Sequence, residues 1–289
     1  MKGPDRVARD PALRRGREIL WVPVFLLGLI LVIAVSADLL PLWGPEAIDL
    51  NNRLAPPVLF AGGTHTHPFG TDALGRDVLS RLIYGARMSL LLAAVIVVLS
   101  AAIGTVVALL SGYYGGRFDA FVSRIVDATL AMPIIFVALL FAVIAGPGLF
   151  NLIAALSLLM WARFARVIRS EVLRVKALDF VRRAQVTGCS TARILGRHIL
   201  PNVLNTVVVL STIQVGWVII AESSLSFLGV GIPPPTPSWG SQIAEGRENM
   251  QSAWWLIVAP GLCIAIAVAG ATLLGDRLRD RLDPNLRNV

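Results

Sequence analysis

The sequence contains few of the residue sets that carry out catalysis. A phosphate-binding loop places a lysine directly after a glycine-rich turn, but the two lysines, Lys2 and Lys176, follow no such turn. The G-x-S-x-G pattern of serine hydrolases is also absent. His65 and His67 lie two residues apart, without cysteine or carboxylate partners at a spacing typical of a metal site. We therefore expect solvated loop histidines, no cofactor bound by this chain and no enzymatic activity.

One polar segment, residues 179–202, combines basic and apolar residues in a pattern typical of two short helices. The first predicted helix has three apolar residues for one face: Phe180, Val181 and Ala184. Gly188 can adopt the left-handed conformation that ends a helix, and Ser190 can cap the next one. Such a basic and apolar projection suits a groove on a cytoplasmic protein, and it equally suits a surface helix that binds lipid head groups.

The elements that would position this segment are membrane helices. Hydrophobic residues make up 56% of the 289-residue chain and charged residues 15%, which is too apolar for a soluble domain. Stretches long enough to cross a hydrocarbon core of about 30 Å recur along the chain. We predict an all-α membrane protein with six transmembrane helices, at about residues 19–40, 88–111, 121–146, 149–168, 204–228 and 254–274. Pro133 and Pro260 should kink the third and the sixth.

The distribution of arginine and lysine predicts the orientation. Of 26 basic residues, 21 lie in the N-terminal segment, the second connection, the region after the fourth helix and the tail, and five lie elsewhere. Because positively charged loops stay in the cytoplasm, we expect both termini to be cytoplasmic. The net charge of +8 is explained by topology and by contact with membrane lipid, so we expect no nucleic-acid partner.

The two predicted external segments follow the first helix and the fifth helix. Apolar residues at helical spacing between Leu74 and Ala86 predict a helix lying on the outer membrane surface. Asp77 and Arg81 should form an i,i+4 pair on its polar face. The prolines of residues 233–237 predict a stiff, extended stretch that covers the outer mouth.

The polar segment at residues 179–202 resembles the EAA loop of bacterial ABC-importer permeases. In that family an Ala-Ala, Gly and Leu-Pro pattern forms the coupling helix that docks on the ATPase. Here the pattern falls on Arg182, Arg183, Ala184, Gly188, Leu200 and Pro201. Arg182 replaces the signature glutamate and Arg183 the first alanine.

Other segments resemble the C-type permease of dipeptide, oligopeptide and nickel importers. They are residues 67–81, 85–90, 112–116, 127–133, 222–229, 237–240 and 275–284. The resemblance implies a type I ABC-importer permease fold in the bacterial cytoplasmic (inner) membrane. It also implies three kinds of protein partner: a homologous B-type permease, two cytoplasmic ABC ATPases and an extracytoplasmic peptide-binding protein. ATP and Mg would be bound by those ATPases and not by this chain.

The resemblance predicts how the chain is organised. Residues 1–87 would hold the cytoplasmic N-terminus, the first transmembrane helix and an extracytoplasmic segment. Residues 88–289 would form a five-helix permease core with a cytoplasmic coupling loop at about 179–200. The residues expected to contact the ATPase are Phe180, Val181, Arg182, Arg183, Ala184, Gly188, Ser190, Leu200 and Pro201.

Polar residues within the predicted helices are candidates for a translocation pathway. Glu222 and Gln214 lie in the fifth helix, and a carboxylate there should face the bundle or water, since facing lipid is costly. Glu222 could meet the amino terminus of a passing peptide, or it could be a buried carboxylate bonded to neighbouring helices. Asp127 lies three residues after Arg124, a spacing that predicts an ordinary helical pair.

The expected function is to form half of the translocation pathway for di- or oligopeptides in an ATP-driven importer. Import of nickel, another metal chelate or glutathione stays open within the same family. An ion-coupled secondary transporter would favour acidic residues near the bilayer centre and inverted repeats. The sequence has few such acids and no evident repeat. An integral-membrane enzyme is disfavoured because no nucleophile, metal set or carboxylate pair converges.

Overall fold

The computed structural model describes residues 21–282, which form helices and loops without a β-strand. The α-helices are α2 (Trp21–Val35), α3 (Val78–Tyr114), α4 (Gly116–Ala131), α5 (Ile134–Ala145), α6 (Leu149–Lys176), α7 (Asp179–Val186), α8 (Thr191–Arg193), α9 (Leu200–Phe227), α10 (Trp239–Gly246) and α11 (Trp255–Leu282). Short 3-10 turns lie at Ala37–Leu39, Leu50–Asn52 and Arg247–Asn249, and a π-helical stretch at Ile194–Ile199.

Each of the six predicted apolar stretches contains helix, but the described residues do not give six spans. Four helices are long and apolar enough to cross a membrane: α3, α6, α11 and the continuous helix from Thr191 to Phe227. The pair α4 and α5 would add a fifth, although the two are bent by 88°. The apolar part of α2, Val24–Val35, is shorter than a full span. The predicted number of six full-length helices is therefore not confirmed by residues 21–282, and the predicted residues 19 and 20 lie outside this range.

The bend between α4 and α5 confirms the predicted kink at Pro133. Met132 is extended, with ψ of 133°, and Pro133 caps the start of α5. Proline forces the preceding residue out of helical geometry and offers no N–H to continue the ladder. Helix α11 contains Pro260 and continues as one helix on both sides of it, and the kink expected there stays a prediction.

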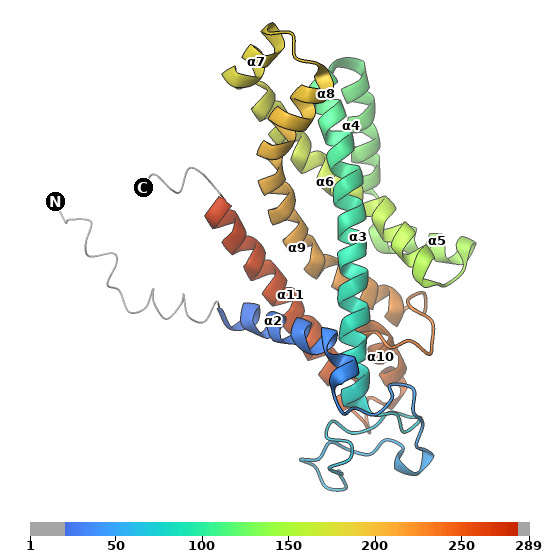
Figure 1. Ribbon diagram of the computed structural model, residues 1–289. Coiled ribbons are helices and arrows are strands. Elements are labelled where there is room, and N and C mark those ends of the chain that lie inside the picture. The colour runs from blue at the N-terminus through green and yellow to red at the C-terminus, as the bar shows by residue number, and fades with distance from the viewer. Residues whose placement is uncertain (1–20, 283–289) are drawn as a thin grey trace, which may run out of the picture.

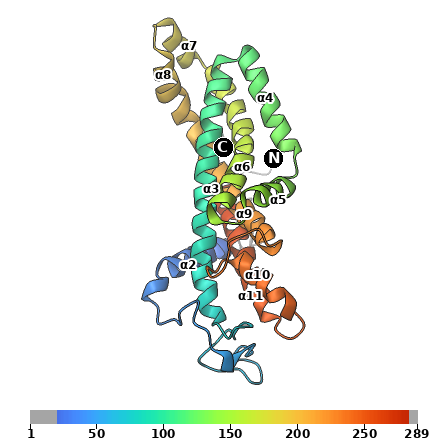
Figure 2. The same cartoon turned by 90° about the vertical axis from the view of Figure 1, so that its right-hand side faces the viewer.

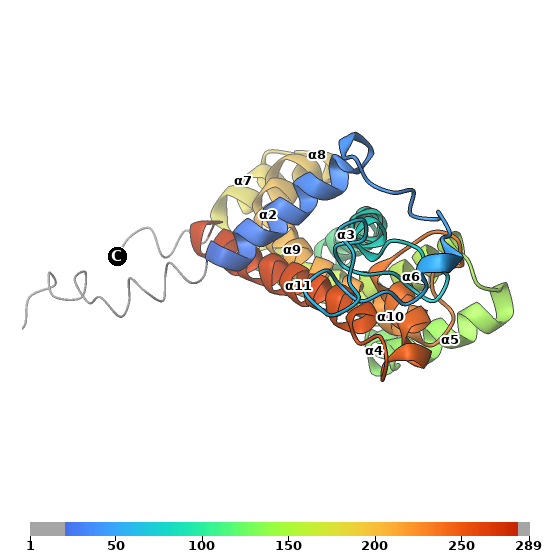
Figure 3. The ribbon, with the colours of Figure 1, turned by 90° about the horizontal axis from the view of Figure 1, so that it is seen from below.

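The helices are arranged around α3, which lies beside α6 along much of its length (Figure 1). Helix α9 packs on α11, and α4 lies on the outer side of α6 (Figure 2). Seen from below, α2 runs beside α11 (Figure 3). The helix α7 marks one end of the molecule, here the knob end, and residues 36–77 mark the opposite end, here the cap end (Figure 1).

Small residues allow the long helices to approach closely. A Cβ at Gly104 of α3 would lie 2.5 Å from the Cβ of Phe164 in α6, and one at Gly275 of α11 would lie 2.7 Å from Ile213 Cγ1 in α9. Such contacts are typical of membrane helix pairs, which associate through van der Waals packing. Around them the side chains of Leu92, Ile96, Leu156 and Met160 are fully buried.

The predicted surface helix between Leu74 and Ala86 is wrong as a separate element. Helix α3 begins at Val78 and continues unbroken to Tyr114, through the predicted division at residues 87 and 88. Asp77 caps it, because its carboxylate accepts a hydrogen bond from the N–H of Ser80 at 2.8 Å. No proline interrupts the sequence between the N-cap residue Asp77 and the apolar stretch that follows, so the helix continues without a break.

Candidate functional site

The turn at the knob end has the geometry that the sequence predicts. Gly188 has φ of +76°, the left-handed conformation. Its N–H donates to Gln185 O at 3.1 Å, and the N–H of Cys189 donates to Ala184 O at 3.0 Å. This pair of bonds is a Schellman motif, which satisfies the last carbonyls of α7. The prediction that Gly188 ends the first short helix is confirmed.

The second predicted short helix is part of a longer one. Ser190 occupies the N-cap position of α8, but its side chain makes no capping bond. From Thr191 the chain continues through the π-helical stretch into α9 as a single 37-residue helix. Pro201 lies in the first turn of α9, and the wider π turn before it accommodates the missing N–H. The projection is thus one short helix, α7, docked on the end of a membrane helix.

The knob, residues 179–200, buries part of its apolar surface and exposes its arginines, while Phe180 and Val186 are also exposed. Val181 and Ile199 are fully buried, and Ala184 is nearly so. Arg182 and Arg183 point to the exposed side of α7. The remaining predicted contact residues are Phe180, Gly188 and Ser190, which are exposed, Leu200, which is half-buried, and Pro201, which is exposed. The fold therefore brings the predicted coupling residues together, with a basic outer face over an apolar inner one.

Ion pairs and a hydrogen bond connect the helices next to the knob. Arg169 of α6 donates through Nε to Asp119 of α4 at 2.5 Å, and Lys176 donates to the Tyr113 carbonyl at the end of α3. Asp127 pairs with Arg166 of α6, so the expected pair with Arg124 is wrong. The Asp127 carboxylate thus pairs with a residue of the helix packed against α4 and not with one of α4 itself.

At the cap end, the loop of residues 36–77 is folded tightly against the helix ends. The indole N–H of Trp255 donates to Thr71 O at 3.3 Å, which ties α11 to the loop. A Cβ at Gly75, where φ is +76°, would lie 1.8 Å from Asp49 O, so this position requires glycine. Arg87 donates to Asp38 at 2.7 Å, and this bond holds the pKa of the Asp38 carboxyl below its ordinary value.

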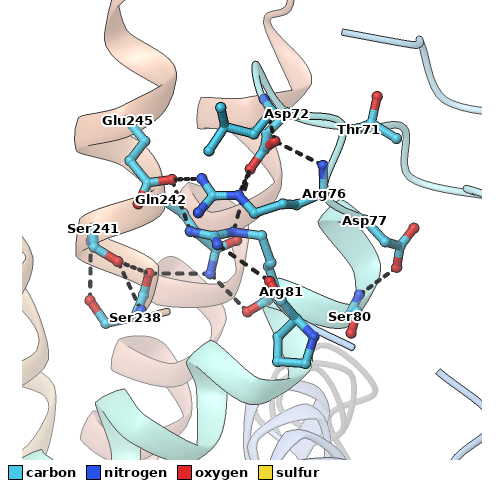
Figure 4. Close-up of polar contacts among 12 residues, drawn as sticks. Thr71, Asp72, Arg76, Asp77, Ser80, Arg81, Ser238, Ser241, Gln242 and Glu245 are labelled. Atoms are coloured by element: carbon cyan, nitrogen blue, oxygen red, sulfur yellow. Dashed lines mark hydrogen bonds and ion pairs between the residues drawn. The ribbon is translucent and has the colours of Figure 1, made fainter. Parts of the chain in front are cut away.

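Four charged side chains, which we call the cap cluster, join three segments at this end (Figure 4). They are Asp72 of the loop, Arg76 beside it, Arg81 in the first turn of α3 and Glu245 of α10. Arg76 Nε donates to Asp72 Oδ2 at 2.6 Å, and Arg81 Nη2 donates to Glu245 Oε2 at 2.8 Å. Arg76 Nη2 also bonds Glu245 Oε2. The Arg81 side chain is only 2% exposed. Its positive charge therefore needs the carboxylates of Glu245 and Asp72, because an unpaired buried charge is strongly destabilising.

The cap cluster corrects two expectations. Arg81 pairs with Glu245 and Asp72 instead of Asp77. Asp77 instead contacts His67, whose Nδ1 lies 3.0 Å from Asp77 Oδ1. His65 is exposed, as expected, but His67 is 4% exposed and is part of the folded cap. The sequence analysis did not identify Asp72, Arg76 or Glu245 as a site. The signal for Asp72 and Arg76 was their place in the family-like segment 67–81, and Glu245 had no such signal.

A cavity of about 370 Å³ opens beside the cap cluster. Its charged lining residues are Asp72, Arg76, Arg81, Glu245 and Glu248, and its uncharged ones include Leu74, Val78, Pro234, Gln242 and Leu256. Gln242 is fixed by a hydrogen bond from Nε2 to the Arg81 carbonyl at 2.9 Å. The cavity is therefore lined by both charged and apolar groups.

Glu222 lies close to the cap end, at the end of α9. Its Oε1 accepts hydrogen bonds from Ser226 at 2.7 Å and from Ser238, the N-cap of α10, at 2.9 Å. The residue is 1% exposed. This is the geometry of the buried alternative, in which the carboxylate links α9 to α10.

Gln214 is also buried, further along α9 toward the knob end, and its Nε2 has no hydrogen-bond partner within the described residues. The pathway role of Glu222 and Gln214 stays a prediction.

Residues 100–288 match the family described as the binding-protein-dependent transport system inner membrane component. The chain belongs to this family. The matched region contains the knob and both pathway candidates, whereas the loop of the cap precedes it. Several apolar helices within a family of inner membrane components make the protein a multi-pass membrane protein.

Relatives of this transport family match nearly the whole chain. The dipeptide transport system permease protein DppC of Haemophilus influenzae is 39% identical, over 91% of this chain and 90% of its own length. The oligopeptide transport system permease protein OppC of Bacillus subtilis is 35% identical, over 96% of this chain and 90% of its own length. These matches include the cap, which therefore lies within the shared part of these permeases.

A solved structure of this fold supports the architecture. The crystal structure of an amino acid ABC transporter with histidines covers 73% of this chain and 95% of its own, with a TM-score of 0.52 and 18% sequence identity. At this identity the match bears on the fold alone. The all-α ABC permease architecture expected from the sequence is thus confirmed, although the number of spans is not.

Proposed function

We propose that this protein is the permease subunit of an ATP-driven importer and forms half of the translocation pathway for short peptides. The observation that carries the proposal is the similarity to permeases named for dipeptide and oligopeptide transport, which extends over about nine-tenths of the chain. The other half of the pathway would come from a homologous B-type permease, and an extracytoplasmic peptide-binding protein would deliver the substrate.

The knob is the proposed contact with two cytoplasmic ABC ATPases, which bind ATP and Mg and carry out the hydrolysis. A short helix with exposed arginines over a packed apolar base suits a groove on another protein. Because α7 is docked on the end of the continuous helix that runs from Thr191 to Phe227, motion of the ATPases would be passed to a membrane helix. Rocking of the helices between outward and inward access would then follow.

The proposed orientation places the knob end in the cytoplasm and the cap end outside. The basic residues concentrate in the segments that join the helices at the knob end and in the two termini, as in cytoplasmic loops. Both termini would then be cytoplasmic, and the cap would face the binding protein.

Uptake by the reconstituted complex tests the proposal. This chain would be co-expressed with a B-type permease, two ABC ATPases and a peptide-binding protein from the same organism. The complex would be placed in proteoliposomes with binding protein outside, and ATP would be enclosed in one sample and omitted from the other. We expect uptake of labelled alanyl-alanine that requires both ATP and this chain. Uptake of a nickel complex or glutathione in place of dipeptides would contradict the peptide assignment. Uptake driven by an ion gradient without ATP would contradict the importer class.

A further inference from the structure

The cavity beside the cap cluster has unmatched charge. Of the five charged residues that line it, Asp72, Arg76, Arg81 and Glu245 balance as two positive and two negative charges. Glu248 is exposed and forms no ion pair within the described residues. The cavity is therefore net negative by one charge and favours a ligand that brings a cation.

Two charged side chains of the cap cluster, one arginine and one glutamate, each have an atom that forms no hydrogen bond within the described residues. Arg76 bonds through Nε and Nη2, and no hydrogen bond from its Nη1 joins it to another described residue. Glu245 accepts both arginine bonds on Oε2, which leaves Oε1 without a donor in the same part of the chain. One guanidinium donor and one carboxylate acceptor are thus available to a ligand at the same site.

The size and the walls of the cavity restrict the ligand further. About 370 Å³ lies in the range of small-molecule sites, which have mostly apolar linings and a few polar groups that fix orientation. Leu74, Pro234 and Leu256 supply apolar surface. A ligand with an ammonium group for the glutamates, a carboxylate for Arg76 and small apolar side chains between them would complement these three kinds of lining group.

We propose that the cap cavity binds a short zwitterionic peptide, with its ammonium group at Glu245 and Glu248 and its carboxylate at Arg76. The permease would then hold its own peptide site outside the membrane, separate from the binding protein and from the helices of the pathway. This inference rests on the proposed function, because it assigns a further site to the same class of substrate.

Cysteine protection tests the site. Ala73 lines the cavity and is half-buried. Ala73→Cys, in a background without the native cysteines, would be labelled with a membrane-impermeant maleimide in the assembled complex without binding protein. We expect alanyl-alanine to slow labelling, and N-acetyl-alanyl-alanine and alanyl-alaninamide to slow it far less. Saturation-transfer NMR with alanyl-alanine on the unmodified complex provides a second measurement that does not depend on the variant.

Two matched variants separate charge at the cavity from charge at the surface. Glu248→Gln should weaken protection by alanyl-alanine about tenfold, the effect of losing one charge-assisted bond. Glu46→Gln removes another exposed carboxylate of the same end, which lines a different cavity, and should leave protection unchanged. An equal effect of both variants would overturn the assignment of the ammonium group.

Two results distinguish this inference from the proposed function. Normal ATP-driven uptake of alanyl-alanine, with labelling and NMR unaffected by peptide or affected equally by its blocked forms, would overturn the cavity site alone. Protection without any peptide uptake by the complete complex would support the site and overturn the proposed function.

Discussion

Replacing Gly188 with valine tests whether the shape of the knob couples it to the ATPases. The glycine has φ of +76°, where an L-residue with a β-branched side chain is strained by about 1 to 2 kcal/mol. A Cβ built there would meet nothing within 4 Å, so no steric clash adds to this cost. The equilibrium between the native turn and an opened turn should therefore shift by about 5- to 30-fold.

Hydrogen exchange of the assembled complex measures this shift where it occurs. The N–H of residue 189 bonds the Ala184 carbonyl only when the turn is formed, so its exchange should accelerate by about the same 5- to 30-fold. The membrane helices lie outside the strained turn, and the amount of inserted protein should change little. Because a re-aimed knob would leave the ATPase groove, peptide uptake should fall more than ATP hydrolysis does.

Gly196→Val is the matched control. Gly196 is exposed, lies in the π-helical stretch at negative φ, and a Cβ at this position would also meet nothing within 4 Å. Valine there should leave exchange at residue 189 and uptake close to those of the parent. Parental exchange and parental uptake in Gly188→Val would refute the strain argument. Fast exchange with fully coupled uptake would remove the knob from coupling and favour its alternative role in binding lipid.

Three further predictions follow from the ends of the molecule and from Glu222. A cysteine at exposed Ala61 should react with an impermeant maleimide in spheroplasts and one at exposed Ala192 should not; the reverse pattern would contradict the orientation. Glu222→Gln keeps an acceptor for both serine hydroxyls, so it should preserve the melting temperature of the complex, whereas Glu222→Ala should lower stability by about 1 to 3 kcal/mol; equal melting temperatures would show that these bonds are unimportant. Glu245→Ala leaves Arg81 buried without its closest carboxylate and should destabilise the cap by about 3 to 5 kcal/mol, seen as faster proteolysis of the loop; an unchanged rate would mean that the pair is not needed.

Features set by neighbouring residues were predictable from the sequence. The left-handed Gly188, the bend at Pro133 and the helical character of each apolar stretch depend on backbone preferences and on hydrophobic length. The knob residues could be predicted as a group for the same reason, because they lie within one short segment.

Features set by distant partners were not predictable. Arg81 and Glu245 are 164 positions apart, and Asp127 and Arg166 are 39 apart, so only helix packing brings them together. Local spacing instead suggested the nearer partners Asp77 and Arg124. The start of α3 was misplaced for a related reason: an amphipathic stretch followed by an apolar one has the same pattern whether the helix continues or breaks.

The length of α3 gives the protein a lever. Its 37 residues span about 55 Å at 1.5 Å per residue, well beyond a hydrocarbon core of about 30 Å. At one end Arg81 pairs with Glu245 of the cap cluster, and at the other the Tyr113 carbonyl accepts a hydrogen bond from Lys176. A rigid rod of this length that tilts by about 10° displaces one tip relative to the other by about 10 Å. A small rotation of α3 about the membrane centre would therefore move its two ends by several ångströms in opposite directions at the two membrane surfaces.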